Sequence, residues 1–226
     1  KANIWIAQRE GRAKDSRDIS NPAIISMLAL NKPKAQDFGD YIASLNIVPV
    51  SISYELDPCD EMKARELTIK AEQGEYQKAE HEDVQSIARG ILGQKNAVHV
   101  AFGQPFGGEL ASVDEVANHL NEQIAKGYVL HPTNCMAYQL IHGRAPEVCV
   151  GSEVKPYIAS EHAEAKAQFE ARLKACPSSW RQQLLNIYAN PVEAKLHPNS
   201  MNTHNTSITA NTSTTPNAAN VIADAK

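Results

Sequence analysis

Residues 47–54 read Ile-Val-Pro-Val-Ser-Ile-Ser-Tyr, and this stretch is the clearest β-strand of the sequence because it is rich in β-branched residues. A second strand-forming run, Asn3–Arg9, lies upstream of it. Two segments with helical spacing, Pro22–Leu30 and Ala35–Leu45, lie between the two strands. The order strand, loop, helix, strand predicts a parallel βαβ unit with a right-handed crossover.

The rest of the chain alternates further helices with one more strand. Ser112 followed by Glu115 forms a capping box, which marks the start of a helix. We therefore expect an α/β fold in which a mostly parallel sheet is flanked by helices, followed by a helical C-terminal region and a disordered tail. The expected elements are helices at Asp60–Tyr76, Glu80–Leu92, Ser112–Lys126, Thr133–His142, Glu161–Ala175 and Ser179–Tyr188, and a strand at Asn96–Phe102.

The composition divides the chain into three parts. Residues 1–145 contain the strands and are expected to form the α/β domain, and residues 146–196 are expected to form a helical extension. Residues 197–226 consist mainly of Asn, Thr, Ser and Ala and contain no Phe, Trp or Tyr. Such a segment cannot bury a core, so we expect a disordered low-complexity tail there.

Charge and hydropathy argue against two classes of protein. The 226 residues carry a formal net charge of −4, which gives no support for binding to nucleic acid. No apolar run reaches the roughly 18–20 residues that span a bilayer. The four cysteines form no Cys-x-x-Cys pair, which favours reduced thiols in a cytosolic setting. The chain begins at Lys1, directly before a strand, so we expect further sequence upstream.

The most informative loop follows the first strand and precedes a capped helix. It contains three cations, Arg9, Arg12 and Lys14, within six residues. These side chains could clamp a phosphate, because arginine offers a bidentate fork of donors. Gly11 lets the backbone approach a ligand closely, and Glu10 could orient an arginine or hold a substrate hydroxyl. Ligands of open α/β sheets bind beyond the carboxyl ends of strands, where this loop is expected to lie.

Two other interpretations of polar residues remain open beside this one. The loop could be a charged surface segment whose ions pair with one another and with Asp15 and Asp18. His131, Cys135 and His142 could suggest a metal, but their spacing lacks the compact ligand set of structural zinc, so we expect no metal site.

Residues Trp5–Arg12, followed some 36 residues later by Val48–Ile52, resemble two signature blocks of the glycerolipid acyltransferase family, which includes the 1-acylglycerol-3-phosphate acyltransferases. In that family a Glu-Gly motif at the end of a strand contacts the substrate phosphate, and a Val-Pro-Val strand follows. The resemblance assigns phosphate binding to Glu10, Gly11 and Arg12, with Arg9 and Lys14 as nearby cations. The sequence departs from the family in two places: Arg9 replaces an apolar pair, and no Thr separates the glycine from Arg12.

The catalytic pair of the family is a His and an Asp separated by four residues, upstream of the Glu-Gly block. None of the eight histidines of this chain has an Asp at that spacing. Only His142 has a carboxylate there, Glu147, and it lies on the wrong side of the motif. We therefore expect no catalytic residue in this chain, a His/Asp pair upstream of Lys1, and no activity from this chain alone.

The resemblance implies an acyltransferase of phospholipid synthesis. Such an enzyme transfers a fatty acyl group from acyl-CoA or acyl carrier protein to a hydroxyl of glycerol phosphate or a lysophospholipid such as lysophosphatidate, with no further cofactor. It would bind the cytoplasmic face of the inner membrane peripherally, through the part upstream of Lys1. The alternative is a non-catalytic α/β module that binds a phosphorylated or lipid ligand.

Overall fold

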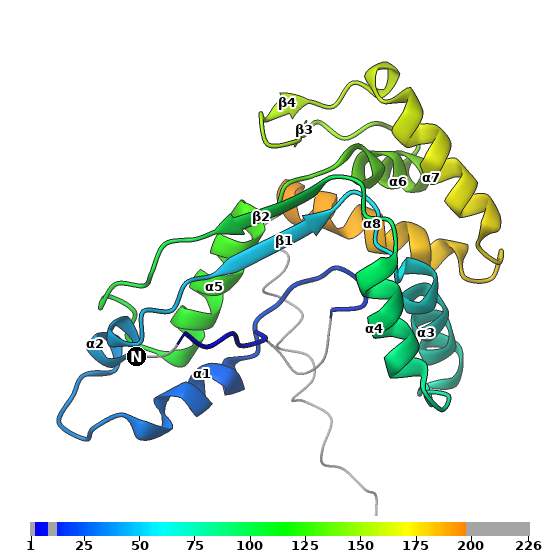
Figure 1. Cartoon of the computed structure of the whole chain (residues 1–226). Helices are drawn as coiled ribbons and strands as arrows, with labels where there is room; N and C mark the ends of the chain where they lie inside the picture. The colour runs from blue at the N-terminus through cyan, green and yellow to red at the C-terminus, as the bar shows by residue number, and fades with distance from the viewer. Residues whose placement is uncertain (1–2, 9–12, 198–226) are drawn as a thin grey trace, which may run out of the picture.

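The computed structural model describes residues 3–8 and 13–197 (Figure 1). Helices predominate, and the strands are short. The elements are α1 (Pro22–Leu28), a 3-10 turn η1 (Ala29–Asn31), α2 (Phe38–Ser44), β1 (Val50–Tyr54), α3 (Asp60–Gln73), α4 (Glu82–Leu92), β2 (Val98–Phe102), α5 (Val113–Gly127), α6 (Pro132–His142), β3 (Cys149–Val150), β4 (Lys155–Pro156), a 3-10 turn η2 (Ala159–Glu161), α7 (Ala163–Ala175) and α8 (Arg181–Leu196). The described chain therefore mixes helices with small sheets.

Both sheets of the described residues are antiparallel, so the mostly parallel sheet expected from the sequence is wrong for this part of the chain. β1 pairs with β2, Val50 lying opposite Phe102 and Tyr54 opposite Val98. β3 pairs with β4 in a second, two-residue ladder. The antiparallel pairing of β1 with β2 follows from the two helices between them. α3 and α4 form an antiparallel hairpin, because Glu61, near the start of α3, contacts Arg89, near the end of α4. This hairpin returns the chain to the same end of β1, so the next strand runs in the opposite direction.

The described part of the predicted strand Asn3–Arg9 pairs with neither sheet. It is extended, but its backbone contact is with the start of α1, where the N–H of Asn21 donates to the carbonyl of Gln8 at 2.8 Å. Ile4, Trp5 and Ile6 are 79%, 73% and 51% exposed. The prediction of a strand at this position is therefore wrong in the structure, although the residue types favour one.

The helix boundaries follow the capping signals of the sequence. The Asn21 side chain accepts a hydrogen bond from the N–H of Ala23 at 3.0 Å, and Pro22 occupies the first turn of α1. The hydroxyl of Ser112 accepts from the N–H of Glu115 at 3.2 Å at the start of α5. Gly143 ends α6 with a φ of 71°, a left-handed conformation that glycine adopts without strain. These predictions are confirmed.

Gly39 is needed for the close approach of α2 to the loop before α5. A Cβ atom at this position would lie 2.2 Å from the carbonyl oxygen of Gly108, well inside van der Waals contact. Gly39 is also buried within α2, which begins at Phe38, three residues later than predicted. The glycine that interrupts the helical pattern in the sequence is therefore a packing requirement of the fold.

Two apolar clusters hold the chain together. The larger lies among α3, α6, α7 and α8, and the smaller lies among α1, α2 and α5. α8 extends beyond the predicted end at Tyr188 to Leu196 and contains the buried Pro191. The largest fully buried apolar side chains of the two clusters are Phe169, Leu184, Val192, Ile42 and Val116.

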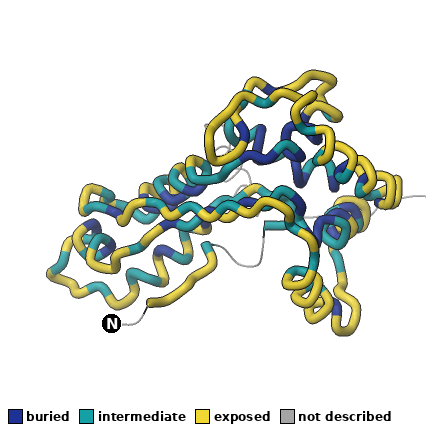
Figure 2. The backbone as a smooth tube through the Cα atoms, turned by 45° about the horizontal axis from the view of Figure 1, so that its top comes forward, coloured by how far each residue is buried: buried dark blue, intermediate teal, exposed yellow. Residues whose placement is uncertain are grey.

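The β1–β2 ribbon is covered on one face only. Ser51 and Ser53 face inward and are buried, whereas Ile52 on the other face of β1 is exposed. β2 carries no buried residue, as Figure 2 shows, and its Val98 and Phe102 are exposed. The apolar face of this ribbon is therefore the one turned to solvent. Among the described residues, no helix is both long and apolar enough to cross a bilayer.

Candidate functional site

The predicted phosphate-binding loop is only partly described. Arg9, Glu10, Gly11 and Arg12 lie outside the described residues. Lys14 is described, and its ammonium forms an ion pair with Glu66 on α3. Glu66 was not among the partners expected for this loop, because it lies 52 positions further along the chain.

Glu66 forms ion pairs with two lysines. Lys70, one turn later on α3, lies 3.0 Å from the other carboxylate oxygen. Burial alone would raise the pKa of Glu66, but the hydrogen bonds from Lys14 and Lys70 outweigh it and lower the pKa below its ordinary value. Lys14 therefore anchors the end of the loop to α3, and its charge is largely neutralised there.

The segment that follows the loop lines a cavity. Ala13, Ser16 and Asp18 form one wall, and Ile52 and Tyr54 of β1 form another. The cavity has a volume of about 420 Å³. Ile52 belongs to the second block of the resemblance described above, and Ala13 directly follows the first block, Trp5–Arg12. None of the described residues of that first block lines the cavity. In Figure 1 this region lies where the right-hand end of β1 meets α3, α4 and α8.

The cavity has a buried floor and an apolar rim. Tyr188 and Asn134 belong to the floor, since they are 3% and 1% exposed. The rim includes Ile87 and Ile91 of α4, which are 49% and 71% exposed. Such a mixture of apolar walls with a few polar groups is typical of a small-molecule site.

Two lysines also line the cavity. The ammonium of Lys63 lies 2.5 Å from a carboxylate oxygen of Asp57, so these two charges compensate each other. Lys95 donates instead to the carbonyl oxygens of Ile91 at 3.2 Å and Gly93 at 3.0 Å, at the C-terminal end of α4. The sequence analysis assigned neither lysine to a site, because only the tertiary structure brings α3, α4 and β1 together.

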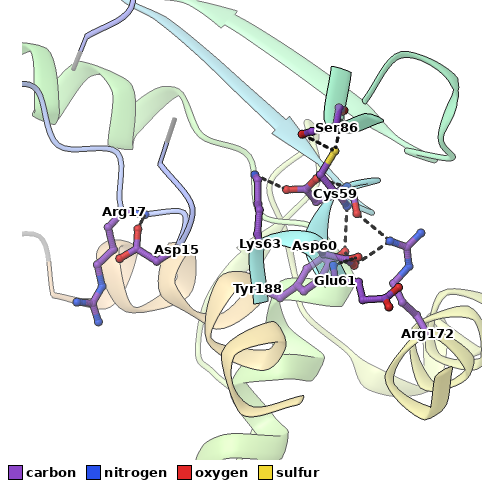
Figure 3. A network of polar contacts seen from close by, with 10 residues as sticks. Asp15, Arg17, Cys59, Asp60, Glu61, Lys63, Ser86, Arg172 and Tyr188 are labelled. Carbon is purple, nitrogen blue, oxygen red and sulfur yellow. Dashed lines mark hydrogen bonds and ion pairs between the residues drawn. The ribbon is translucent and has the colours of Figure 1, made fainter. Parts of the chain in front are cut away.

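A buried polar network holds the floor of the cavity. Figure 3 shows Asp60 between Tyr188 and Arg172. The hydroxyl of Tyr188 donates to Asp60 at 2.7 Å and accepts from the N–H of Asp57 at 2.9 Å. The guanidinium of Arg172 lies 2.8 Å from the same oxygen of Asp60. Burial raises the pKa of Asp60, and the charge of Arg172 only partly offsets this effect. The network joins α3, α7 and α8 and fixes two residues that line the cavity, Asp57 and Tyr188.

None of the described residues that line the cavity is a histidine. His131 is buried, and its Nε2 lies 3.2 Å from the hydroxyl of Ser53, on the inner face of β1. Burial lowers the pKa of His131. His142 contacts Glu193 of α8 at 2.8 Å, a carboxylate other than the Glu147 considered from the sequence.

The three residues weighed as metal ligands do not form a metal site in the structure. Within residues 3–8 and 13–197, no group of three or more His, Cys, Asp or Glu side chains is placed to hold a metal ion. Burial raises the pKa of Cys135 to about 12, so its thiol stays protonated at neutral pH.

Comparison of the chain with models of protein families, with curated proteins and with solved structures found no match.

Proposed function

We propose that this chain is the acceptor-binding part of a glycerolipid O-acyltransferase. The enzyme would move a fatty acyl group from acyl-CoA or acyl carrier protein to a hydroxyl of glycerol phosphate or lysophosphatidate, at the cytoplasmic face of the inner membrane. One observation carries the proposal: Ala13, which directly follows Arg12 in the sequence, and Ile52, from the Val-Pro-Val block, line the same cavity. A residue that follows the first block and a residue of the second block, far apart in the sequence, thus line one cavity.

In the proposed reaction the acceptor hydroxyl attacks the thioester carbonyl. A base takes the hydroxyl proton, the new ester bond forms, the carbon–sulfur bond breaks, and the thiolate leaves and is protonated. Arg12 and Arg9 would hold the acceptor phosphate, Gly11 would let the backbone approach it, and Glu10 would orient an arginine. Lys14 would act indirectly, since its ion pair with Glu66 holds the end of the loop against α3.

A non-catalytic module that binds a phosphorylated or lipid ligand is the second candidate. Two observations favour it: no histidine is among the described residues that line the cavity, and no His/Asp pair of the family spacing occurs in the sequence. Both candidates require anion binding at Arg12, so they differ only in whether an acyl group is transferred.

Titration calorimetry with glycerol 3-phosphate and with lysophosphatidate tests the shared part of the two candidates. Replacing Arg12 with Ala should weaken binding at least tenfold, since a bidentate charge-assisted contact contributes about 1.5–3 kcal/mol. Lys34→Ala serves as the control, because Lys34 is an exposed lysine that does not line the cavity. Equal affinities of Arg12→Ala and the wild-type chain, or no binding at all, would refute the phosphate site.

Acyl transfer from radiolabelled palmitoyl-CoA separates the candidates. We expect no product from this chain. The same assay is then made on the chain extended upstream to the start codon of its gene. Product from the extended chain, lost in its Arg12→Ala variant, supports the enzyme. Phosphate binding without product from the extended chain supports the binding module.

A further inference from the structure

The apolar rim of the cavity continues over one face of α4. We define this face by Val84, Ile87 and Ile91, which recur at helical spacing and are 64%, 49% and 71% exposed. Val84 and Ile91 are seven positions apart, which corresponds to about 10 Å along the helix axis. Ile52 of β1, 37% exposed, lies across the cavity from this face.

This arrangement is unusual for a helix of a globular protein. A surface helix normally turns its apolar stripe toward the core and its charges toward solvent. α4 has a well-defined apolar stripe, yet within the described part of the chain that stripe is exposed and borders a cavity. Contiguous exposed apolar surface beside a cavity marks a binding site more often than a solvated surface.

Lys95 places a positive charge at one end of the same face. Its ammonium has three N–H donors, and the carbonyls of Ile91 and Gly93 accept two of them. No carboxylate lies within 4.0 Å of it in residues 3–8 and 13–197. Lys63, the other lysine of the cavity, is compensated by Asp57. The Lys95 end of the cavity is therefore the place for a negative group.

We propose that the cavity binds a single-chain anionic lipid as a monomer. The third N–H of Lys95 bonds the anionic head group, and the alkyl chain lies along Ile87, Ile91 and Ile52. The charge of Lys95 and the length of the apolar face together select a molecule that has both an anionic head group and an alkyl chain. This site rests on described residues alone and does not require acyl transfer or the loop containing Arg12.

Dodecyl phosphate below its critical micelle concentration is the probe, with binding followed by calorimetry on the full chain. Dodecanol lacks the negative charge and therefore tests the contribution of the charge. Inorganic phosphate lacks the alkyl chain and therefore tests the contribution of that alkyl chain. We expect dodecyl phosphate to bind at least tenfold more tightly than either. Lys95→Gln should weaken binding at least fivefold, and the double variant Ile87→Ser, Ile91→Ser at least tenfold. Lys95→Arg, which keeps the charge, should bind within a factor of three of the wild type.

The controls are an exposed lysine and an exposed apolar residue outside the cavity. Lys174→Gln on α7 and Leu140→Ser on α6, the latter 58% exposed in the wild type, should bind like the wild type. Melting temperatures of all variants verify that each is folded. If Lys95→Gln is not folded, Lys95→Arg still tests the proposal.

Three outcomes overturn the proposal. In the first, the Lys95 and isoleucine variants bind no worse than the controls. In the second, inorganic phosphate binds as tightly as dodecyl phosphate, which indicates an anion site without a lipid chain. In the third, the chain binds vesicles of phosphatidylglycerol but not the monomer, which indicates a membrane surface instead of a cavity. Loss of binding in Arg12→Ala with Lys95→Gln unaffected would leave the phosphate loop supported and this site refuted.

Discussion

Removing the hydroxyl of Tyr188 tests whether the polar network beneath the cavity stabilises the fold. This hydroxyl donates to Asp60, which is 1% exposed, and accepts from the N–H of Asp57. In Tyr188→Phe the first bond, to a charged acceptor, is lost at a cost of about 1.5–3 kcal/mol, and the second at about 0.5–1.5 kcal/mol. Arg172 and the N–H of Glu61 still bond Asp60, so the carboxylate keeps two donors. We therefore expect a total loss of about 2–4 kcal/mol.

Urea denaturation followed by circular dichroism measures this loss. In thermal denaturation of a folded part of this size, the melting temperature should fall by about 4–16 °C. Tyr54→Phe is the matched control, because the hydroxyl of Tyr54 makes no hydrogen bond within the described residues, and it should lie within about 0.5 kcal/mol of the wild type. A loss below about 0.5 kcal/mol in Tyr188→Phe would show that the network does not stabilise the fold.

The pH dependence of the same variant gives a second check. The folded-state pKa of Asp60 is raised above its ordinary value of 3.8, mainly by burial. The folded state thus takes up this proton at a higher pH than the unfolded state, and the cost of burying the carboxylate falls as the solution is acidified. Tyr188→Phe removes a donor to the ionised form and raises this pKa further. The difference in stability between variant and wild type should therefore shrink as the pH falls toward 3.8.

Three further predictions follow from packing, charge and burial. Gly39→Ala should destabilise the chain by about 1–3 kcal/mol because its Cβ would clash with a backbone carbonyl. Gly90→Ala in α4, where the nearest atom to a Cβ would be 3.8 Å away, should stabilise it by up to about 1 kcal/mol; thermal denaturation compares the two. Glu66→Gln should destabilise the chain at neutral pH. Because the pKa of Glu66 is lowered from 4.5 in the folded state, this difference should vanish as the pH falls through the folded pKa, which acid titration of stability measures. Of the four thiols, Cys149 alone is exposed and should react fast with a thiol reagent, while the other three react only on unfolding.

The elements that the sequence predicted well are those marked by signals a few residues apart. Asn21 and Ser112 cap the helices that they were expected to cap, and Gly143 ends α6. Most other helices and both longer strands lie within a few residues of their expected ranges, whereas α8 runs eight residues further. Its continuation past Tyr188 escaped prediction because Pro191 argues locally against a helix, whereas packing of α8 against α6 and α3 maintains it.

The candidate site was predictable only in part. The Glu-Gly-Arg motif predicted a phosphate site at residues 9–14. The structure describes only the last two of these residues, and one of them, Lys14, forms an ion pair with Glu66. The cavity residues Lys63 and Lys95 carried no local signal, since lysines on charged helices are common. The sequence predicted the helix that contains Val84, Ile87 and Ile91, but it did not predict that these side chains are exposed.

The sequence by itself determined where helices begin and end and which segments favour strands, because caps, turns and apolar periodicity act over a few neighbouring residues. The tertiary structure decided which strand β1 pairs with, which face of the ribbon and of α4 stays exposed, and where the cavity lies. It also decided the partners of the buried polar groups: Asp60 and Tyr188 form a hydrogen bond across 128 positions of the chain. Contacts of this kind depend on how whole elements pack against one another, and no short stretch of sequence contains that information.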